Sequence, residues 1–162
     1  MTWSDPNVNP YREDVGDTRY SGSEILIRRL TEMGAEIRVH DPYVEQWWEF
    51  TNQESYPDNN KSVFFRNQKR LNDLVVLNDL KAALKDIDVL ALAVRHEEYL
   101  NLDPDEIVGL AQKPIAVVDC FGILDDEKIK RYLQLGCEVK GLGRGHIRRL
   151  KEEVKVKREG DI

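Results

Sequence analysis

The chain has 162 residues, of which 41% are hydrophobic and 33% are charged, and its formal net charge is −6. This length suits one ordinary domain, and the composition is that of a globular protein with a charge-rich surface. The negative net charge argues against general nucleic-acid binding, and no apolar run approaches the roughly 20 residues of a membrane-spanning helix.

The first ten residues, MTWSDPNVNP, contain two prolines and no alternating apolar run. We therefore expect residues 1–10 to be an irregular lead-in without a strand. The segment also lacks the charged and apolar regions of a signal peptide, so we expect a cytoplasmic protein that contacts neither nucleic acid nor membrane.

A polar loop directly precedes the first predicted helix. The loop has charged side chains at Arg12, Asp14, Asp17 and Arg19. Ser21 and Glu24 have the spacing of a capping box, and Gly34 stands where a helix would end. An apolar face is predicted from Ile25, Leu26, Leu30 and Met33. Because a helix N-terminus attracts anions, the loop is a candidate anion-binding site.

A buried strand is predicted around Ile37 and Val39, before Asp41-Pro42. Residues 43–73 then change character, with turn-rich composition and an aromatic cluster at Trp47, Trp48 and Phe50. These aromatics either cover a sheet edge or a helix, which we favour, or mark a subunit contact.

The rest of the chain alternates between apolar strands and capped helices. Strands are predicted at 75–77, 88–94, 114–120 and 137–143, and helices begin near Asn78, Asp103 and Asp125. This alternation predicts an α/β, three-layer Rossmann-like domain, with a mainly parallel sheet and helices on both faces. The last residues, LKEEVKVKREGDI, predict a frayed helix or a tail.

Three motifs together resemble the C-terminal, UDP-sugar-binding domain of the UDP-glucose/GDP-mannose dehydrogenase family. They are Tyr11-Arg12, the run Asp14-Val15-Gly16-Asp17-Thr18-Arg19-Tyr20-Ser21, and Asp41-Pro42. The resemblance implies a nucleotide-sugar-binding domain over residues 11–150 and a charged tail over 151–162. The family places its first strand just before the aromatic-basic pair, and residues 1–10 offer no such strand.

The resemblance also implies roles for individual residues. Arg12 would contact the nucleotide-sugar, and Tyr11 would line the uridine site; without the resemblance, Arg12 would be a surface residue paired with Glu13 or Asp14. Arg19 resembles the family arginine that reaches the NAD of the complete enzyme, and it could also pair with Asp17 to shape the loop. Asp14 and Asp17 are expected to shape the loop through bonds to its backbone.

We predict no catalytic and no metal-binding residue in this chain. His40, His96 and His146 are scattered along the sequence, and Cys120 lacks the glycine-rich motif of the family's catalytic cysteine. The two cysteines, Cys120 and Cys137, are expected to be reduced thiols.

Two glycine-containing segments are further candidates. The loop Asp119-Cys120-Phe121-Gly122 follows a predicted strand, where ligands bind in open sheets, but Phe121 and Gly122 replace the arginine or asparagine of several family members. The run Gly141, Gly143, Gly145 departs from a dinucleotide fingerprint, because His146 stands at its third glycine position. It resembles the Gly-Leu-Gly-Arg run that ends the family's C-terminal domain.

The resemblance implies a function only in the context of a larger enzyme. Members oxidise the C6 alcohol of a nucleotide sugar to a carboxylate with NAD. We expect the UDP-sugar-binding domain without the NAD-binding and cysteine-bearing domains, inactive alone or half of a split enzyme whose N-terminal half is separately encoded. The Val-Gly-Asp-Thr-Arg-Tyr-Ser form of the loop and the run Arg95-His96-Glu97-Glu98-Tyr99 resemble members that act on N-acetylated amino sugars more than members that act on glucose.

One alternative is a non-catalytic module that completes its sheet with a partner or by self-association as a homo-oligomer. Another is a decayed remnant without a role.

Overall fold

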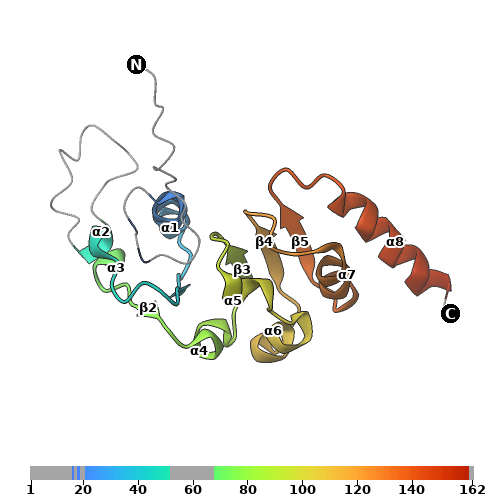
Figure 1. Cartoon of the computed structure of the whole chain (residues 1–162), viewed down its shortest axis with the longest axis horizontal. Coiled ribbons are helices and arrows are strands. Elements are labelled where there is room, and N and C mark those ends of the chain that lie inside the picture. The colour runs from blue at the N-terminus through green and yellow to red at the C-terminus, as the bar shows by residue number, and fades with distance from the viewer. Residues whose placement is uncertain (1–15, 17, 19–20, 52–67, 161–162) are drawn as a thin grey trace, which may run out of the picture. The chain divides into compact units, whose positions relative to one another are not determined.

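The computed structural model describes residues 16, 18, 21–51 and 68–160. The chain divides into two compact units, unit 1 (Met1–Ala83) and unit 2 (Leu84–Ile162), and each unit has its own parallel sheet (Figure 1). Helices alternate with parallel strands, so the prediction of a Rossmann-like α/β fold is confirmed. The single domain over 11–150 stays a prediction. No described helix is long and apolar enough to cross a membrane.

Unit 1 contains short strands and helices around a two-stranded sheet. Its described elements are α1 (Gly22–Glu32), β1 (Val39–His40), α2 (Trp48–Thr51), α3 (Lys69–Asn72), β2 (Val76–Leu77) and the start of α4 (Leu80–Leu84). Strand β1 pairs with β2 in parallel, with Val39 opposite Val76. The N-cap of α4 is Asp79 rather than the predicted Asn78, because the Asp79 carboxylate accepts from the Lys81 N–H at 2.9 Å.

Aromatic residues build the core of unit 1. Trp47 and Phe50 are buried with their ring centroids 4.9 Å apart, and they pack with Ile27, Val44, Leu71 and Val76. The interpretation that the aromatic cluster covers an element is therefore confirmed for these two residues. Trp48, the third member, is exposed.

The predicted apolar face of α1 is wrong. Ile25 and Met33 are 44% and 71% exposed, whereas Glu24, Ile27 and Arg28 are buried. The buried residues follow the spacing of one helical face, but two of them are charged, so a count of apolar residues selects the wrong side. Glu24 and Arg28 are tolerated there because they form an ion pair at 2.8 Å.

Unit 2 is a three-stranded parallel sheet with helices in its connections. Its elements are β3 (Val89–Leu92), α5 (Glu97–Leu100), α6 (Pro104–Ala111), β4 (Ala116–Asp119), α7 (Asp126–Gln134), β5 (Glu138–Gly141) and α8 (Ile147–Gly160). The strand order is β3-β4-β5, with Leu90 opposite Val117 and Val117 opposite Val139 (Figure 1).

Capping residues set the ends of the unit 2 helices as predicted. Asp103 caps α6 and Asp125 caps α7 through backbone N–H groups at 2.9 and 2.8 Å. Where its side chains are described, the final segment is a packed helix rather than a tail. Ile147, Leu150 and Val154 of α8 are buried. Helix α8 lies against α7 and β5.

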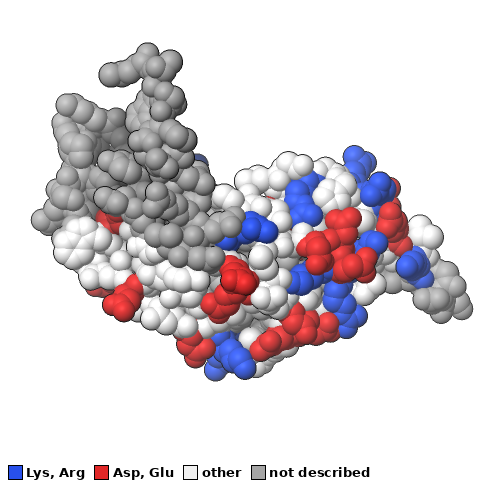
Figure 2. Space-filling view, viewed as in Figure 1, with Lys and Arg blue, Asp and Glu red and all other residues white. Residues whose placement is uncertain are grey.

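The two faces of the unit 2 sheet differ in burial. Val117 and Val139 are buried on one face, whereas Val89, Glu138 and Lys140 are exposed on the other. The exposed residues lie in the outer strands β3 and β5, whereas the central strand β4 has no exposed residue, and charged residues in β5 fit its exposed side. Acidic and basic side chains are interspersed over the visible surface of unit 2 (Figure 2).

Candidate functional site

The residues predicted to bind ligand lie outside the described part of the chain. Tyr11, Arg12 and Arg19 are among them, as are Asp14 and Asp17. Their predicted roles therefore stay predictions. The described residues of the same loop, Gly16, Thr18 and Ser21, show how the loop is held.

Gly16 approaches the turn that follows β1. A Cβ atom built on Gly16 would lie 2.2 Å from the carbonyl oxygen of Tyr43, which is far inside van der Waals contact. The backbone can pass this close to the turn only because glycine has no side chain. Gly16, from the Asp-x-Gly-Asp-Thr-Arg motif, therefore lies against the turn that begins at Asp41-Pro42, more than 20 residues away in sequence.

Asp41 fixes the turn against which Gly16 lies. Its Oδ1 atom accepts from the N–H groups of Tyr43 at 2.8 Å and Val44 at 3.1 Å, as in an Asx turn. The Asp41 N–H in turn donates to the Leu77 carbonyl, which ties the turn to β2. The conformation of the loop around Gly16 thus depends on the end of the unit 1 sheet.

Thr18 and Ser21 join the loop to helices. The Thr18 hydroxyl donates to the Glu49 carboxylate of α2 at 2.7 Å, and the Thr18 carbonyl accepts from the Ser21 N–H at 3.2 Å. Ser21 is the N-cap of α1, as predicted, and its Oγ accepts from the Ser23 N–H at 3.2 Å. The loop is thereby anchored at three of its described residues.

The first turn of α1 already contains a negative charge. The buried Glu24 carboxylate accepts from the Nε of Arg28 at 2.8 Å, and the Arg28 guanidinium lies 5.2 Å from the centroid of the Phe50 ring. An acidic residue in the first turn interacts favourably with the helix dipole. Glu24 therefore meets part of the dipole of α1 from within the helix, and Arg28 compensates the charge of Glu24.

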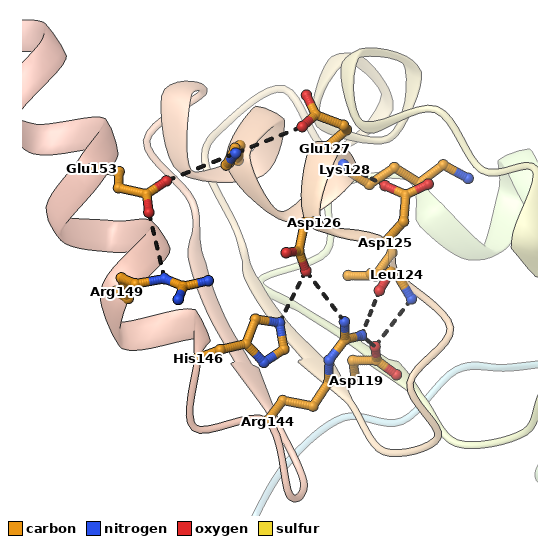
Figure 3. A network of polar contacts seen from close by, with 11 residues as sticks. Asp119, Leu124, Asp125, Asp126, Glu127, Lys128, Arg144, His146, Arg149 and Glu153 are labelled. Atoms are coloured by element: carbon orange, nitrogen blue, oxygen red, sulfur yellow. Dashed lines mark hydrogen bonds and ion pairs between the residues drawn. The ribbon is translucent and has the colours of Figure 1, made fainter.

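A second candidate region is the carboxyl end of the unit 2 strands. Asp119, the last residue of β4, is fully buried and accepts from the N–H groups of Phe121, Ile123 and Leu124 at 3.2, 3.0 and 3.1 Å. The Nη1 atom of Arg144 donates to the same carboxylate at 2.9 Å (Figure 3). A buried carboxylate with these partners holds the whole turn after β4 in place.

Arg144 connects two adjacent loops. Its Nη1 also donates to the Leu124 carbonyl, and its Nη2 lies 3.8 Å from Asp126, whose Oδ1 is 3.0 Å from the His146 Nε2 (Figure 3). A Cβ on Gly141 would come within 2.9 Å of the Arg144 side chain, so glycine lets the arginine fold back. The Gly-Leu-Gly-Arg run is therefore a clamp between the β4-α7 and β5-α8 loops.

Two apolar side chains are exposed in this second region. Phe121 and Leu142 are 40% and 69% exposed at the ends of neighbouring strands β4 and β5. Arg144 beside them is engaged by Asp119, so its charge is largely compensated. Phe121 stands where several family members have an arginine or asparagine, so this loop offers an apolar side chain at that position.

The surroundings of the Cys120 and His96 side chains fit structural roles rather than catalytic ones. Burial, and then the charge of Asp119, raise the pKa of the Cys120 thiol, which disfavours the reactive thiolate. His96 is buried with its ring centroid 5.4 Å from that of Tyr99. Both cysteines are free thiols, and the described residues contain no cluster of groups that could hold a metal ion.

Sequence reasoning missed Asp119 and Arg144 as partners. They are 25 residues apart, and neither residue belongs to a local pattern that reports burial or pairing. The one available signal was the run Gly141-Leu142-Gly143-Arg144, which resembles the end of the family domain. That resemblance did not indicate which residue pairs with Arg144.

Comparisons with known proteins agree on one family. The model of the UDP-glucose/GDP-mannose dehydrogenase family, UDP binding domain, matches residues 10–126. The chain is 26% identical over 103 residues to the UDP-N-acetyl-D-mannosamine dehydrogenase of Methanocaldococcus jannaschii, covering 64% of this chain and 18% of that protein. It is 25% identical over 138 residues to the UDP-glucose 6-dehydrogenase of Drosophila melanogaster, covering 85% and 27%.

A solved structure shares the fold. It is the NDP-N-acetyl-D-galactosaminuronic acid dehydrogenase from Methanosarcina mazei Go1, with a TM-score of 0.64 and 21% identity over 85% of this chain and 24% of that chain. The present chain thus spans about a quarter or less of the length of these relatives.

Proposed function

This chain belongs to the UDP-glucose/GDP-mannose dehydrogenase family and contains its UDP-binding domain, and from that premise we propose that it binds the nucleotide part of a UDP-sugar. The observation that carries the proposal is the matched range, which includes the whole loop before α1 and the Asp41-Pro42 turn. The tight approach of Gly16 to Tyr43 supports it, because a pre-shaped loop loses less entropy when it binds.

The proposed binding residues lie in the loop that Gly16, Thr18 and Ser21 anchor. Arg12 offers a planar fork of donors to diphosphate or carbonyl oxygens, and Tyr11 lines the uridine. Arg19 is proposed to contact NAD, the cofactor that accepts the hydride in the complete enzyme.

We further propose that the chain contributes to C6 oxidation of a UDP-sugar as the sugar-nucleotide half of a larger site. The proposal gives no residue of this chain a catalytic role in the oxidation. The NAD-binding and cysteine-bearing parts would belong to the rest of the enzyme, whether on this polypeptide or on a separately encoded one. The relative named UDP-N-acetyl-D-mannosamine dehydrogenase supports an amino-sugar substrate, whereas the Drosophila relative of similar identity is named UDP-glucose 6-dehydrogenase.

Calorimetric titration of the protein with UDP tests the proposal, with UDP-N-acetylmannosamine and UDP-glucose in parallel. Arg12→Ala should weaken UDP binding by about 10- to 100-fold, because a hydrogen bond to a charged group contributes about 1.5–3 kcal/mol. Arg19→Ala should leave UDP binding unchanged. Arg148→Ala is the matched control, since this arginine is exposed on α8.

The absence of heat at millimolar UDP from a folded sample would overturn the proposal. Equal losses in the Arg12→Ala and Arg148→Ala variants would also overturn it, because they would show a diffuse charge effect rather than a site.

A further inference from the structure

The loop before α1 contacts one segment of unit 1 at two of its residues. This supporting segment, residues 43–51, includes the turn after β1 and helix α2. Gly16 lies against its first residue, Tyr43. The Thr18 hydroxyl donates to the Glu49 carboxylate near its other end, at 2.7 Å. The position of the loop therefore depends on how firmly the supporting segment is held.

Buried side chains hold the supporting segment in place. Val44, Trp47 and Phe50 all belong to the buried core of unit 1. Glu49 directly precedes Phe50 in α2, so the backbone of Glu49 has little freedom while the Phe50 ring stays packed. The Glu49 carboxylate is consequently a hydrogen-bond acceptor at a fixed place beside the loop.

Helix α1 packs on the same Phe50 ring. The Arg28 guanidinium lies 5.2 Å from the ring centroid, and Arg28 pairs with Glu24 in the first turn of α1. That turn follows the N-cap Ser21, whose N–H donates to the Thr18 carbonyl at 3.2 Å. Thr18 is therefore held through its side chain by α2 and through its carbonyl by the start of α1.

An acidic side chain at position 49 can affect an anionic ligand in two ways. A carboxylate accepts a stronger hydrogen bond from a hydroxyl group than a neutral oxygen does, which favours a fixed loop. A carboxylate near a diphosphate would, by its charge alone, weaken binding. Because the two effects on UDP affinity have opposite signs, removal of Glu49 distinguishes them.

We propose that Glu49 is a positioning residue for UDP binding, which orders the loop before α1 through Thr18 and does not contact the ligand. The inference rests on the proposed function, because that loop contains Tyr11 and Arg12. A loop that is already in place loses less entropy when it binds a ligand. Loss of the bond between Thr18 and Glu49 should therefore lower UDP affinity while the core of unit 1 stays folded.

Calorimetric titration with UDP tests the role of this bond. Thr18→Val and Glu49→Ala should each weaken binding by about 5- to 20-fold, because each removes one partner of a charge-assisted hydrogen bond. The double variant should bind no more weakly than the single ones, since both changes break the same contact. Thr18→Ser keeps the hydroxyl and should bind as the wild type does. Glu45→Ala is the matched control, because Glu45 is an exposed carboxylate of the same supporting segment.

Amide hydrogen exchange without ligand measures how firmly the loop is held. The Ser21 N–H, which donates to the Thr18 carbonyl, should exchange about 5- to 20-fold faster in Thr18→Val and Glu49→Ala. The Phe50 N–H donates to the Trp47 carbonyl at 3.2 Å within the supporting segment and should keep its wild-type rate. Faster exchange of both amides would show a general loosening of α2 and would overturn the positioning role.

Tighter UDP binding in Glu49→Ala would also overturn the proposal, because the carboxylate would then act by its charge. Wild-type affinity in Thr18→Val, or wild-type exchange of the Ser21 amide in both variants, would overturn it as well. A wild-type protein that binds no UDP, with faster Ser21 exchange in the variants, would overturn the proposed function but support the ordering of the loop by Glu49.

Discussion

A methyl group at position 16 has no room, because the carbonyl oxygen of Tyr43 would lie 2.2 Å from it. Gly16→Ala should therefore push the loop off the turn after β1 and weaken UDP binding at least 10-fold in calorimetry. Gly109→Ala is the control, since a Cβ there meets nothing within 4 Å. Unchanged binding in Gly16→Ala would show that the contact does not shape the site.

The Asp119–Arg144 pair should be important for stability. Arg144→Met leaves a fully buried carboxylate with its three backbone donors but without its cation, so we expect a loss of about 2–3 kcal/mol in urea unfolding. Arg131→Met, which removes an exposed partner of Asp105, should have a far smaller effect. Similar losses in both variants would contradict the clamp.

Single residues were predicted well where a local pattern reports them. Ser21, Asp103 and Asp125 were identified as caps, because the capping bond joins neighbours in sequence. Arg144 and Asp119 were not paired, because their bond depends on how two loops fold back at the end of the sheet. Long-range polar contacts of this kind have no signature in one sequence.

At the scale of elements, α8 should be attached to β5 in a pH-dependent way. The hydrogen bond from Lys151 holds the pKa of Glu138 below its ordinary value. A lowered folded-state pKa contributes stability above the ordinary glutamate pKa, and this stability is lost as the pH falls through the folded value. Because the pair is half-exposed, we expect Glu138→Gln to cost at most about 1 kcal/mol at pH 7.

Urea unfolding at pH 7 and at about pH 3 measures this effect. The difference between wild type and Glu138→Gln should become smaller at the lower pH, because protonation of the glutamate removes the charge that pairs with Lys151. Glu152→Gln is the control on the same helix, because its partner Arg148 is 3.9 Å away. A difference that persists unchanged at low pH would show that the carboxylate charge is not its cause.

Element positions followed from the sequence better than element faces did. The alternation of apolar runs and caps located the strands and helices of unit 2, since both signals are local. The buried side of α1 was misassigned, because Glu24 and Arg28 satisfy each other inside unit 1. In sequence, a buried pair of charged residues has the same pattern as a solvent-exposed charged face. The two cases can be told apart only when the contacts of the charged residues are known.

At the scale of the whole molecule, the two units differ in the sheet and the core that stabilise them. Unit 1 rests on two-residue strands and on an aromatic core around Trp47 and Phe50. Unit 2 has three paired strands and capped helices α6 and α7. The sequence predicted parallel strands throughout, but strand composition alone does not report where one sheet ends and another begins.

The sheet formed by the described residues of unit 1 has two strands, and two-stranded sheets are marginally stable, so unit 1 should open before unit 2. In native-state hydrogen exchange, we expect the amides of β1 and β2 to lose protection at lower denaturant than those of β4. Saturating UDP should then raise the opening free energy of unit 1, by about 2.7 kcal/mol at 100 times Kd. The increase should be small for β4 if UDP binds the loop before α1, because the contacts of the described loop residues Gly16 and Thr18 lie within unit 1. Equal protection of both units without ligand would instead show that they unfold as one cooperative body.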